Sequence, residues 1–309
     1  MTPSVLILSH AGDRHADAVA RHLDDAGVMT VRLDTGDIGR SDIPVEMWVS
    51  RGSVHGTIHG CDLAEVVGAW HRRPSQFTIS DPVDLAELRA GVGGVLAWLP
   101  YLNHPADMAL AGLKAYQLVT AVRCRLAVPD TMISTGRATA ESFAAVRERV
   151  VVKAMSRDVA GLVSEDDRSG WGRAAHLTQQ LITAAWHARL TVVDDAVFAA
   201  RIDSPHLDWR TNLDRCAYAV VDVPPDEVTN VRELMHRLRL RFAAIDFVVD
   251  DHDRWWFLEA NPNGQWLWIE HATGLPIAAA VARALCTAPG GERRRPRPSI
   301  VGPTLSRER

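Results

Sequence analysis

Two acidic residues lie on facing strands of a predicted β-hairpin in the last third of the chain. The β-rich runs 243–250 and 255–261 flank the turn-forming segment 251–254, a pattern typical of a hairpin. If residues 251–254 form the loop, cross-strand pairing places Asp246 directly opposite Glu259. Opposed carboxylates lie only about 5 Å apart and repel each other, so a compensating positive charge is expected between them.

A hard dication would supply that charge. Asn261 lies two residues beyond Glu259 and shares its face of the strand, so Asp246, Glu259 and Asn261 form an all-oxygen donor set. Such donors suit Mg²⁺, which normally completes its coordination shell with phosphate and water. The alternative is a solvent-facing hairpin whose acids are merely hydrated, but the Asn-Pro-Asn-Gly sequence that begins at Asn261 is an unusual strand continuation.

Lysine is nearly absent from this chain. Of 34 basic residues only Lys114 and Lys153 are lysines, so arginine was accepted wherever a cation only had to be hydrated. Either codon bias left two accidental survivors, or a compact ammonium group is required where a planar guanidinium does not fit. The second interpretation makes both lysines candidate functional residues.

The elements that carry these residues predict an α/β (α+β) protein with three lobes. Strand, helix and strand signals follow one another at 4–33, and further strands are expected at 45–50, 54–59 and 66–71, before a helix at 82–99. We expect the following division: an N-terminal α/β lobe at 1–105, a central lobe at 106–182, a C-terminal lobe at 183–287 and a disordered Pro/Arg-rich tail at 288–309.

The two candidate lysines belong to the central lobe. Residues 106–126 are strongly helical and contain Lys114, whereas Lys153 ends a buried strand that follows a helix at 139–149. Residues 155–176 mix glycines with charges and predict a mobile loop or short hairpin. A clear helix is also expected at 225–240.

Composition excludes several classes of function. A formal charge of -4 and the lack of a basic stripe argue against nucleic-acid binding. The beginning of the chain lacks a signal-peptide pattern, and no apolar run is long enough for a membrane span. The four cysteines are widely spaced and form no CxxC pair, so reduced core thiols in a cytoplasmic protein are expected.

The hairpin and its continuation resemble a known family. Asp246-Phe247 with Leu258-Glu259-Ala260-Asn261-Pro262 resembles the metal-binding signature of the ATP-grasp fold. The run 257–270 is similar to that of the graspetide (microviridin-type) synthetases, also called ATP-grasp ribosomal peptide maturases, which process RiPPs. Trp70-His71-Arg72-Arg73-Pro74, Asn103-His104-Pro105 and the run 273–277 extend the likeness to about residue 285.

This resemblance implies an ATP site. Lys114 and Lys153 would contact phosphates, Gln179, Gln180, Leu181 and Ile182 resemble the hinge that binds adenine, and Arg189 matches the usual arginine in a segment where His187 replaces an acid. We include Asn212, Val248 and Phe257 among the expected nucleotide contacts. The segment 155–176 would be the lid over the phosphates, although it is short and acidic for that role.

The resemblance also assigns catalytic and substrate roles. Asp208-Trp209-Arg210-Thr211-Asn212 resembles a family motif in which Arg210 would stabilise the transferring phosphoryl group, with Lys153 as its partner. Without the family context, the alternative for Arg210 is a surface ion pair. Arg72 and Arg73 would bind peptide carboxylates or simply cap the first lobe.

The expected activity is that of an ADP-forming carboxylate–amine or carboxylate–hydroxyl ligase that uses ATP and Mg²⁺. It would phosphorylate Asp or Glu side chains of a ribosomally made precursor peptide, with leader and core, and close ester or amide cross-links. A cytoplasmic homodimer is expected. Two alternatives remain: a ligase that adds glutamate or another amino acid to a peptide or protein terminus, and a nucleotide-binding pseudoenzyme that only escorts a peptide.

Overall fold

The computed structural model describes residues 3–40, 43–147, 149–155, 160–162, 175–206 and 208–287. Its contacts divide the chain into two compact units. The first combines Met1–Pro105 with Pro276–Arg309, and the second is Ala106–Leu275. Within the described residues, every helix is too short or too polar to cross a membrane.

A three-stranded parallel sheet forms the centre of the first unit. Its strands lie in the order β2 (Met29–Leu33), β1 (Ser4–Ser9), β6 (Val66–Arg73). All six residues of β1 are buried, as expected for the middle strand of a covered parallel sheet. The helix α1 (Arg14–Asp25) follows β1, and the Asp13 side chain caps it by accepting a hydrogen bond from the His15 amide.

The remaining elements of the first unit surround this sheet. They are the 3₁₀ turn η1 (Thr35–Asp37), the antiparallel strands β3 (Val45–Ser50), β4 (Ser53–Ile58) and β5 (Cys61–Asp62), and the helices α2 (Pro82–Leu96) and α8 (Ile277–Cys286). The helix α8 falls within the C-terminal lobe expected at 183–287, but its contacts assign it to the first unit. The helix packs on α1 and β6, where a side chain at Gly68 would collide with the Leu285 carbonyl.

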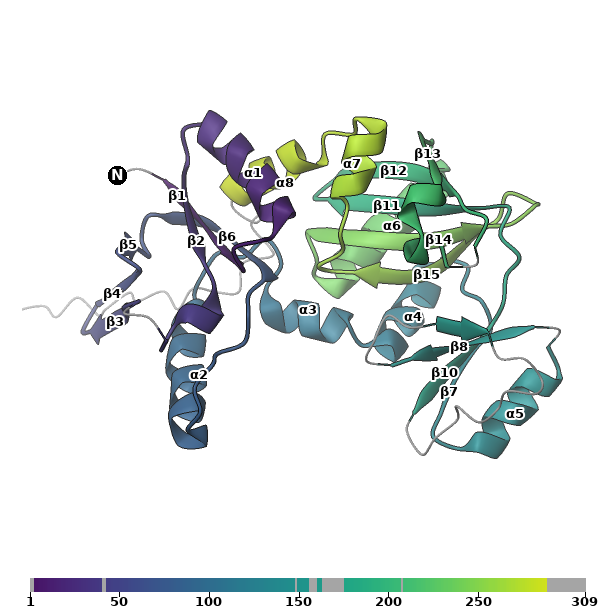
Figure 1. Cartoon of the computed structure of the whole chain (residues 1–309), viewed down its shortest axis with the longest axis horizontal. Coiled ribbons are helices and arrows are strands. Elements are labelled where there is room, and N and C mark those ends of the chain that lie inside the picture. Colours follow the sequence, from purple (N-terminus) through teal and green to yellow (C-terminus); the bar gives the residue numbers. More distant parts are fainter. Residues whose placement is uncertain are drawn as a thin grey trace, which may run out of the picture. The chain divides into compact units, whose positions relative to one another are not determined.

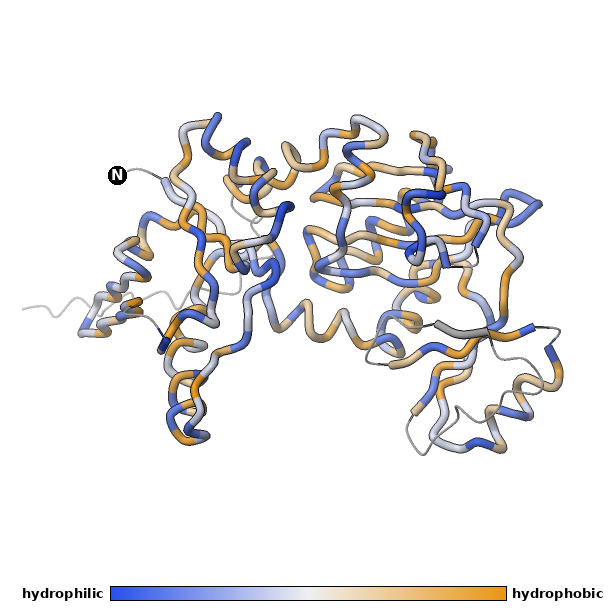
Figure 2. The backbone as a smooth tube through the Cα atoms, in the orientation of Figure 1, coloured by the Kyte–Doolittle hydropathy of each residue, from blue (hydrophilic) through white to orange (hydrophobic). Residues whose placement is uncertain are grey.

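A five-stranded antiparallel sheet forms the core of the second unit (Figure 1). Its order is β13 (Ala217–Val220), β12 (Ala196–Asp203), β11 (Trp186–Val193), β14 (Phe242–Val249), β15 (Trp255–Asn261). The helix α6 (Pro225–Leu238) contributes Val231, Leu234 and Leu238 to the apolar cluster on this sheet. In Figure 2 the tube is hydrophilic at the β14–β15 turn and largely hydrophobic along β14.

The second unit contains a smaller sheet as well. Its strands lie in the order β7 (Thr131–Ser134), β10 (His176–Gln180), β8 (Val150–Ala154), β9 (Ala160–Leu162), and α5 (Arg137–Ala145) packs against β7 and β10. Lys153 is the fourth residue of β8. Apart from β9 and the residues at either end, the predicted lid 155–176 lies outside the described residues, as does the predicted tail 288–309.

The helix predicted at 106–126 is two helices. It is interrupted at Gly112-Leu113, so that α3 (Pro105–Ala111) ends before α4 (Lys114–Arg123) begins. Glycine weakens a helix interior, and here it allows a new helix to start with Lys114 as its first residue. The short helices η2 (Trp209–Thr211), η3 (Leu213–Arg215) and α7 (Leu267–Thr273) complete this unit.

The predicted hairpin forms, but between Asp246 and the turn its strand register differs by one residue from the register expected from the sequence. Asp246 pairs with Glu259 as expected, whereas Val248 pairs with Trp256 and not with Phe257. A register shift between Asp246 and Phe247 leaves one extra residue on β15, which is a β-bulge. Sequence periodicity cannot reveal such an inserted residue, because every side chain on one side of it changes face.

Candidate functional site

The acid pair predicted on the hairpin is surrounded by basic side chains from three other segments. Asp246 Oδ1 accepts a hydrogen bond of 2.6 Å from Nη1 of Arg189, on β11. Glu259 Oε1 lies 3.2 Å from Nη1 of Arg210, in η2, and its Oε2 lies 3.9 Å from Nζ of Lys114, at the start of α4. Side chains from four segments that lie far apart in sequence therefore meet around one pair of strands.

Lys153 is the fourth basic residue at this place. Its Nζ lies 2.9 Å from Oε1 of Gln179 on β10, and the Gln179 amide in turn donates to the Thr131 hydroxyl at 2.9 Å. Burial lowers the pKa of Lys153; the charge of Glu259 works against this, and the charges of Lys114 and Arg210 add to it. A cation that is held by a neutral amide retains its attraction for an anionic ligand.

Lys114 is held at the site by its own helix. The Gln117 side chain, one turn further along α4, donates to the Ala260 carbonyl at 2.6 Å and accepts from the Ala260 amide at 2.8 Å. These bonds tie α4 to β15 next to Glu259. Acidic residues are favoured in the first turn of a helix, yet α4 has none and begins with a lysine. The helix dipole and the ammonium group together attract an anion.

Arg210 is held in a forked ion pair. Asp208 caps the η2 turn and accepts hydrogen bonds from Nε and Nη2 of Arg210 at 2.9 and 3.1 Å. Burial alone would lower the pKa of Arg210, but the bond to Asp208 and the charge of Glu259 outweigh it and raise the pKa above its ordinary value. Burial would raise the pKa of Asp208, and the contacts with Arg210 reverse this effect. Both groups are charged at neutral pH.

The donor set at the acid pair fits a magnesium ion. Asp246 Oδ2 accepts no hydrogen bond from the described residues, and the Asn261 carboxamide oxygen accepts only the Asn263 amide, at 3.0 Å. Within the described part of the chain no three His, Cys, Asp or Glu residues form a metal cluster. Two carboxylates and one amide therefore form an incomplete oxygen shell, as Mg²⁺ uses when phosphates and water supply its other ligands.

The predicted adenine hinge lies where β10 ends. The Gln180 amide donates to the Asp130 carbonyl at 2.8 Å, and the Leu181 amide donates to the Arg149 carbonyl at 2.9 Å. The Ile182 amide has no hydrogen-bond partner among the described residues. Of these three amides, the one of Ile182 is therefore able to bind a ligand without breaking a bond within the protein.

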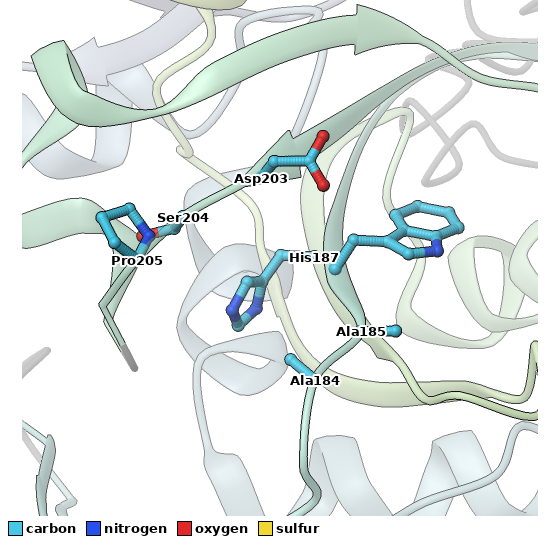
Figure 3. Close-up of a pocket in the computed structure, with 7 residues that line it drawn as sticks. Ala184, Ala185, His187, Asp203, Ser204 and Pro205 are labelled. Atoms are coloured by element: carbon cyan, nitrogen blue, oxygen red, sulfur yellow. The ribbon is translucent and has the colours of Figure 1, made fainter.

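A pocket of about 260 Å³ lies beyond this hinge, between the start of β11 and the end of β12. Figure 3 shows the His187 ring between Pro205 and Ala184, with Asp203 on the adjacent strand. Burial lowers the pKa of His187 although the nearby charge of Asp208 opposes this, so the imidazole is neutral at physiological pH. At this position the family has an acidic residue, whereas this chain has a neutral imidazole that can both donate and accept a hydrogen bond.

Two expected nucleotide contacts lie on different faces of the hairpin. Val248 is on the face of Asp246 and pairs with His187 on β11. Phe257 is fully buried with its ring 5.8 Å from that of Phe247, because the bulge turns it into the core. Phe257 therefore packs in the core of the second unit, and its contact with a nucleotide stays a prediction.

Arg72 and Arg73 belong to the first unit, whereas the cluster described above belongs to the second. The Arg72 side chain is fully buried, and its Nε donates to Asp13 Oδ2 at 3.1 Å. Arg73 is exposed. The expectation that Arg72 binds a peptide carboxylate does not fit this burial, whereas the alternative that it stabilises the first lobe does.

Three residues at the site have roles that the sequence alone did not assign to them. They are Asp208, which orients Arg210, Gln117, which ties α4 to β15, and Trp209, which packs near Arg189. The spacing of Asp208 and Arg210, typical of a capped turn, could have indicated the first. Nothing local distinguishes Gln117, since its partner Ala260 is 143 residues away in sequence. Asn212 lies between η2 and η3, at the end of the Arg210 turn.

Solved structures share this architecture. Macrocyclase MdnC from Microcystis aeruginosa MRC, bound with precursor peptide MdnA, is 24% identical, with a TM-score of 0.81 over 94% of this chain and 100% of that one. A RiPP-associated ATP-grasp ligase from Chryseobacterium gregarium, in complex with ADP and a leader and core peptide, is 22% identical, with a TM-score of 0.83 over 92% and 97% of the two chains.

A third structure, ATP-grasp ligase PsnB complexed with a phosphomimetic variant of minimal precursor, Mg and ADP, is 18% identical. Its TM-score is 0.77, over 92% of this chain and 98% of that one. No protein-family model and no curated protein matches the sequence. The α/β architecture predicted from the sequence is thereby confirmed, and the chain has the ATP-grasp fold.

Proposed function

We propose that this chain is an ADP-forming ligase that cross-links side chains of a ribosomally made precursor peptide. The observation that carries the proposal is the convergence of Lys114, Lys153 and Arg210 on the Asp246–Glu259 pair. This cluster has the charge needed by a nucleotide triphosphate and its metal. The fold is shared with a macrocyclase and a RiPP-associated ligase that were each solved with a peptide, which supports a precursor peptide as the substrate.

Each residue of the cluster has a defined task in this reaction. Lys114 and Lys153 hold the phosphates of ATP, and the Ile182 amide with the pocket at His187 holds the nucleoside. Arg210, oriented by Asp208, stabilises charge on the γ-phosphoryl group of ATP as an Asp or Glu carboxylate of the peptide attacks it, which releases ADP and leaves an acyl phosphate on the peptide. Mg²⁺ held by Asp246, Glu259 and Asn261 would supply further neutralisation of phosphate charge.

The second half of the reaction closes the ring. A Ser or Thr hydroxyl, or a Lys amine, of the same peptide attacks the acyl phosphate and releases phosphate, giving an ester or an amide. Positioning and charge account for most of this catalysis, since no group of the protein needs to form a covalent bond.

Mass spectrometry of a candidate precursor, incubated with the protein and ATP, tests the proposal. We expect the peptide to lose one water per bond formed, with ADP and phosphate released in equal number. Mild base should restore the water if the bonds are esters and leave it lost if they are amides. A peptide that gains the mass of an added amino acid would instead identify a terminal amino-acid ligase, and absence of nucleotide turnover would identify an escort protein.

The partners expected from the sequence form part of the same proposal. A leader segment of the precursor would anchor the peptide while its core reacts, and a homodimer is expected. Binding of synthetic leader to the protein, followed by sedimentation velocity with and without it, would measure both.

A further inference from the structure

Arg189 occupies an unusual position for a residue expected to contact a nucleotide. The residue is only 5% exposed, and its guanidinium forms a fork between two groups of the protein. Nη1 donates to Asp246 Oδ1 at 2.6 Å, while Nη2 donates to the Gln265 carbonyl at 2.9 Å. Both side chains of the Arg189–Asp246 pair are more than nine-tenths buried.

Two tryptophan side chains pack against the Arg189 guanidinium. Its Cζ atom lies 5.8 Å from the ring centroid of Trp209 and 5.8 Å from that of Trp268, and the two rings are 5.9 Å apart. Trp209 directly precedes Arg210 in the η2 turn. Arg189 therefore contacts both the strand that carries Asp246 and the turn that carries Arg210.

The loop after β15 is pressed against the same group. A Cβ atom at Gly264 would lie 2.3 Å from the Cβ of Ala244 and 3.0 Å from Nη2 of Arg189. Only glycine allows so close an approach, which brings the Gln265 carbonyl within reach of Arg189. The guanidinium is thus fixed from three sides, by β14, by the loop and by the aromatic pair.

This arrangement divides the two oxygens of Asp246 between two tasks. Oδ1 is bonded to Arg189, whereas Oδ2 accepts no hydrogen bond from the described residues. We propose that Arg189 is a positioning residue. It holds Asp246 so that Oδ2 faces the divalent cation, and it holds the turn that carries Arg210 beside that cation. The proposal rests on the metal assignment made under the proposed function.

A competing physical effect makes the proposal testable. A fixed positive charge beside a metal site repels the metal, so removing it would tighten Mg²⁺ binding if charge alone mattered. Loss of a group that orients a metal ligand weakens metal binding instead, by about 10–100-fold. The two roles predict changes of opposite sign.

The experiment measures ADP binding by isothermal titration calorimetry in EDTA and across a series of Mg²⁺ concentrations. Arg189→Met removes the charge and the fork with little change in volume, and Arg189→Lys retains the charge without the fork. Arg237→Met is the control, because Arg237 forms an exposed pair with Glu233 on α6. Circular dichroism and thermal unfolding verify the fold of each variant.

We expect both Arg189 variants to need about 10–100-fold more Mg²⁺ than the wild type for half of the effect of Mg²⁺ on ADP affinity, each measured relative to the same variant in EDTA. An unchanged or lower Mg²⁺ requirement in Arg189→Met would overturn the positioning role. If that variant does not fold, Arg189→Lys decides, and a wild-type requirement there overturns the proposal. Absence of any Mg²⁺ effect in the wild type would defeat the metal assignment itself, and with it both proposals.

Discussion

Two buried arginine–aspartate pairs, one in each unit, use their hydrogen bonds differently. In the first unit Arg72 pairs with Asp13, at 3.1 Å between Nε and Oδ2. In the second unit Arg189 pairs with Asp246, at 2.6 Å between Nη1 and Oδ1. Burial is nearly the same in both, since no side chain of the four exceeds 8% exposure.

The two aspartates differ in how many of their carboxylate oxygens remain available to a ligand. Asp13 Oδ2 also accepts the Ser9 hydroxyl at 3.0 Å, and its Oδ1 accepts the His15 amide at 2.9 Å as the cap of α1. Both oxygens of Asp13 are therefore used within the protein. Asp246 keeps one oxygen available and faces Glu259, another carboxylate.

Charge separates the two regions as well. Burial raises the pKa of Asp13, but the contacts with His15, Arg72 and Ser9 outweigh it and hold the pKa well below its usual range. Burial lowers the pKa of Arg72 to about 10, so that both partners of this pair are charged at neutral pH. The second region adds Lys114, Lys153 and Arg210 to its acids. A buried ion pair is present in both regions, so burial alone does not identify a ligand site. The region suited to a ligand is the one with an excess of cations and a carboxylate oxygen that accepts no hydrogen bond from the described residues.

Breaking the pair of the first unit should have the largest effect on stability. Arg72→Met leaves the Asp13 charge buried without its counter-ion, and we expect the free energy of unfolding to fall by about 3–5 kcal/mol. Urea denaturation measures this loss, with Arg51→Met, in an exposed turn, as the control. Nucleotide affinity of the folded variant should not change. Unaltered stability together with weaker peptide binding would return Arg72 to the substrate-binding residues.

Removing one acid of the second region should affect activity and spare the fold. Glu259→Gln takes away a metal donor and the partner of Arg210 and Lys114, and we expect product formation to fall by about 10²–10³-fold. The thermal midpoint should be kept, because one of two repelling charges is gone. Product is measured by mass spectrometry, and Glu233→Gln on the exposed face of α6 is the control. Full activity of Glu259→Gln would refute the metal assignment.

Exchanging the buried lysine for arginine tests whether shape matters beyond charge. In Lys153→Arg, a planar guanidinium replaces the ammonium group that donates a hydrogen bond to Gln179. We expect kcat/KM to fall by about a hundredfold, because the phosphate would be misplaced. An exposed exchange, Arg237→Lys, should have no effect. Steady-state kinetics of both variants provide the comparison. A near-normal rate for Lys153→Arg would mean that the two lysines survive by chance.

The smallest expected effect is the pH dependence of the first pair. Because the folded pKa of Asp13 is depressed, its stabilisation is complete above the unfolded value near 3.8 and is lost as the pH falls towards the folded pKa. Asp13→Asn should therefore show a smaller drop in thermal midpoint between about pH 5 and about pH 3 than the wild type. Parallel curves for the two proteins would show that Asp13 does not couple folding to protons in this range.

The residues that form the candidate site could largely be identified from the sequence. Residue type and local spacing determine the hairpin, because β-rich runs on either side of a polar turn leave few other structures. They also place Asp246 opposite Glu259, and the scarcity of lysine points to Lys114 and Lys153. These signals are local or compositional, so they do not depend on how the chain packs.

Only the tertiary structure decided which partners these residues meet. The bulge that buries Phe257 depends on how the two strands pair, and the packing of α8 in the first unit depends on segments far away in the sequence. Arg72 and Arg189 look alike in sequence, as arginines near the ends or starts of buried strands. Their roles diverge because one meets an aspartate whose oxygens are already used, and the other meets an aspartate with an oxygen to spare. Hydrogen-bonding capacity is settled by contacts across 59 and 57 residues of chain, respectively, and no local pattern encodes it.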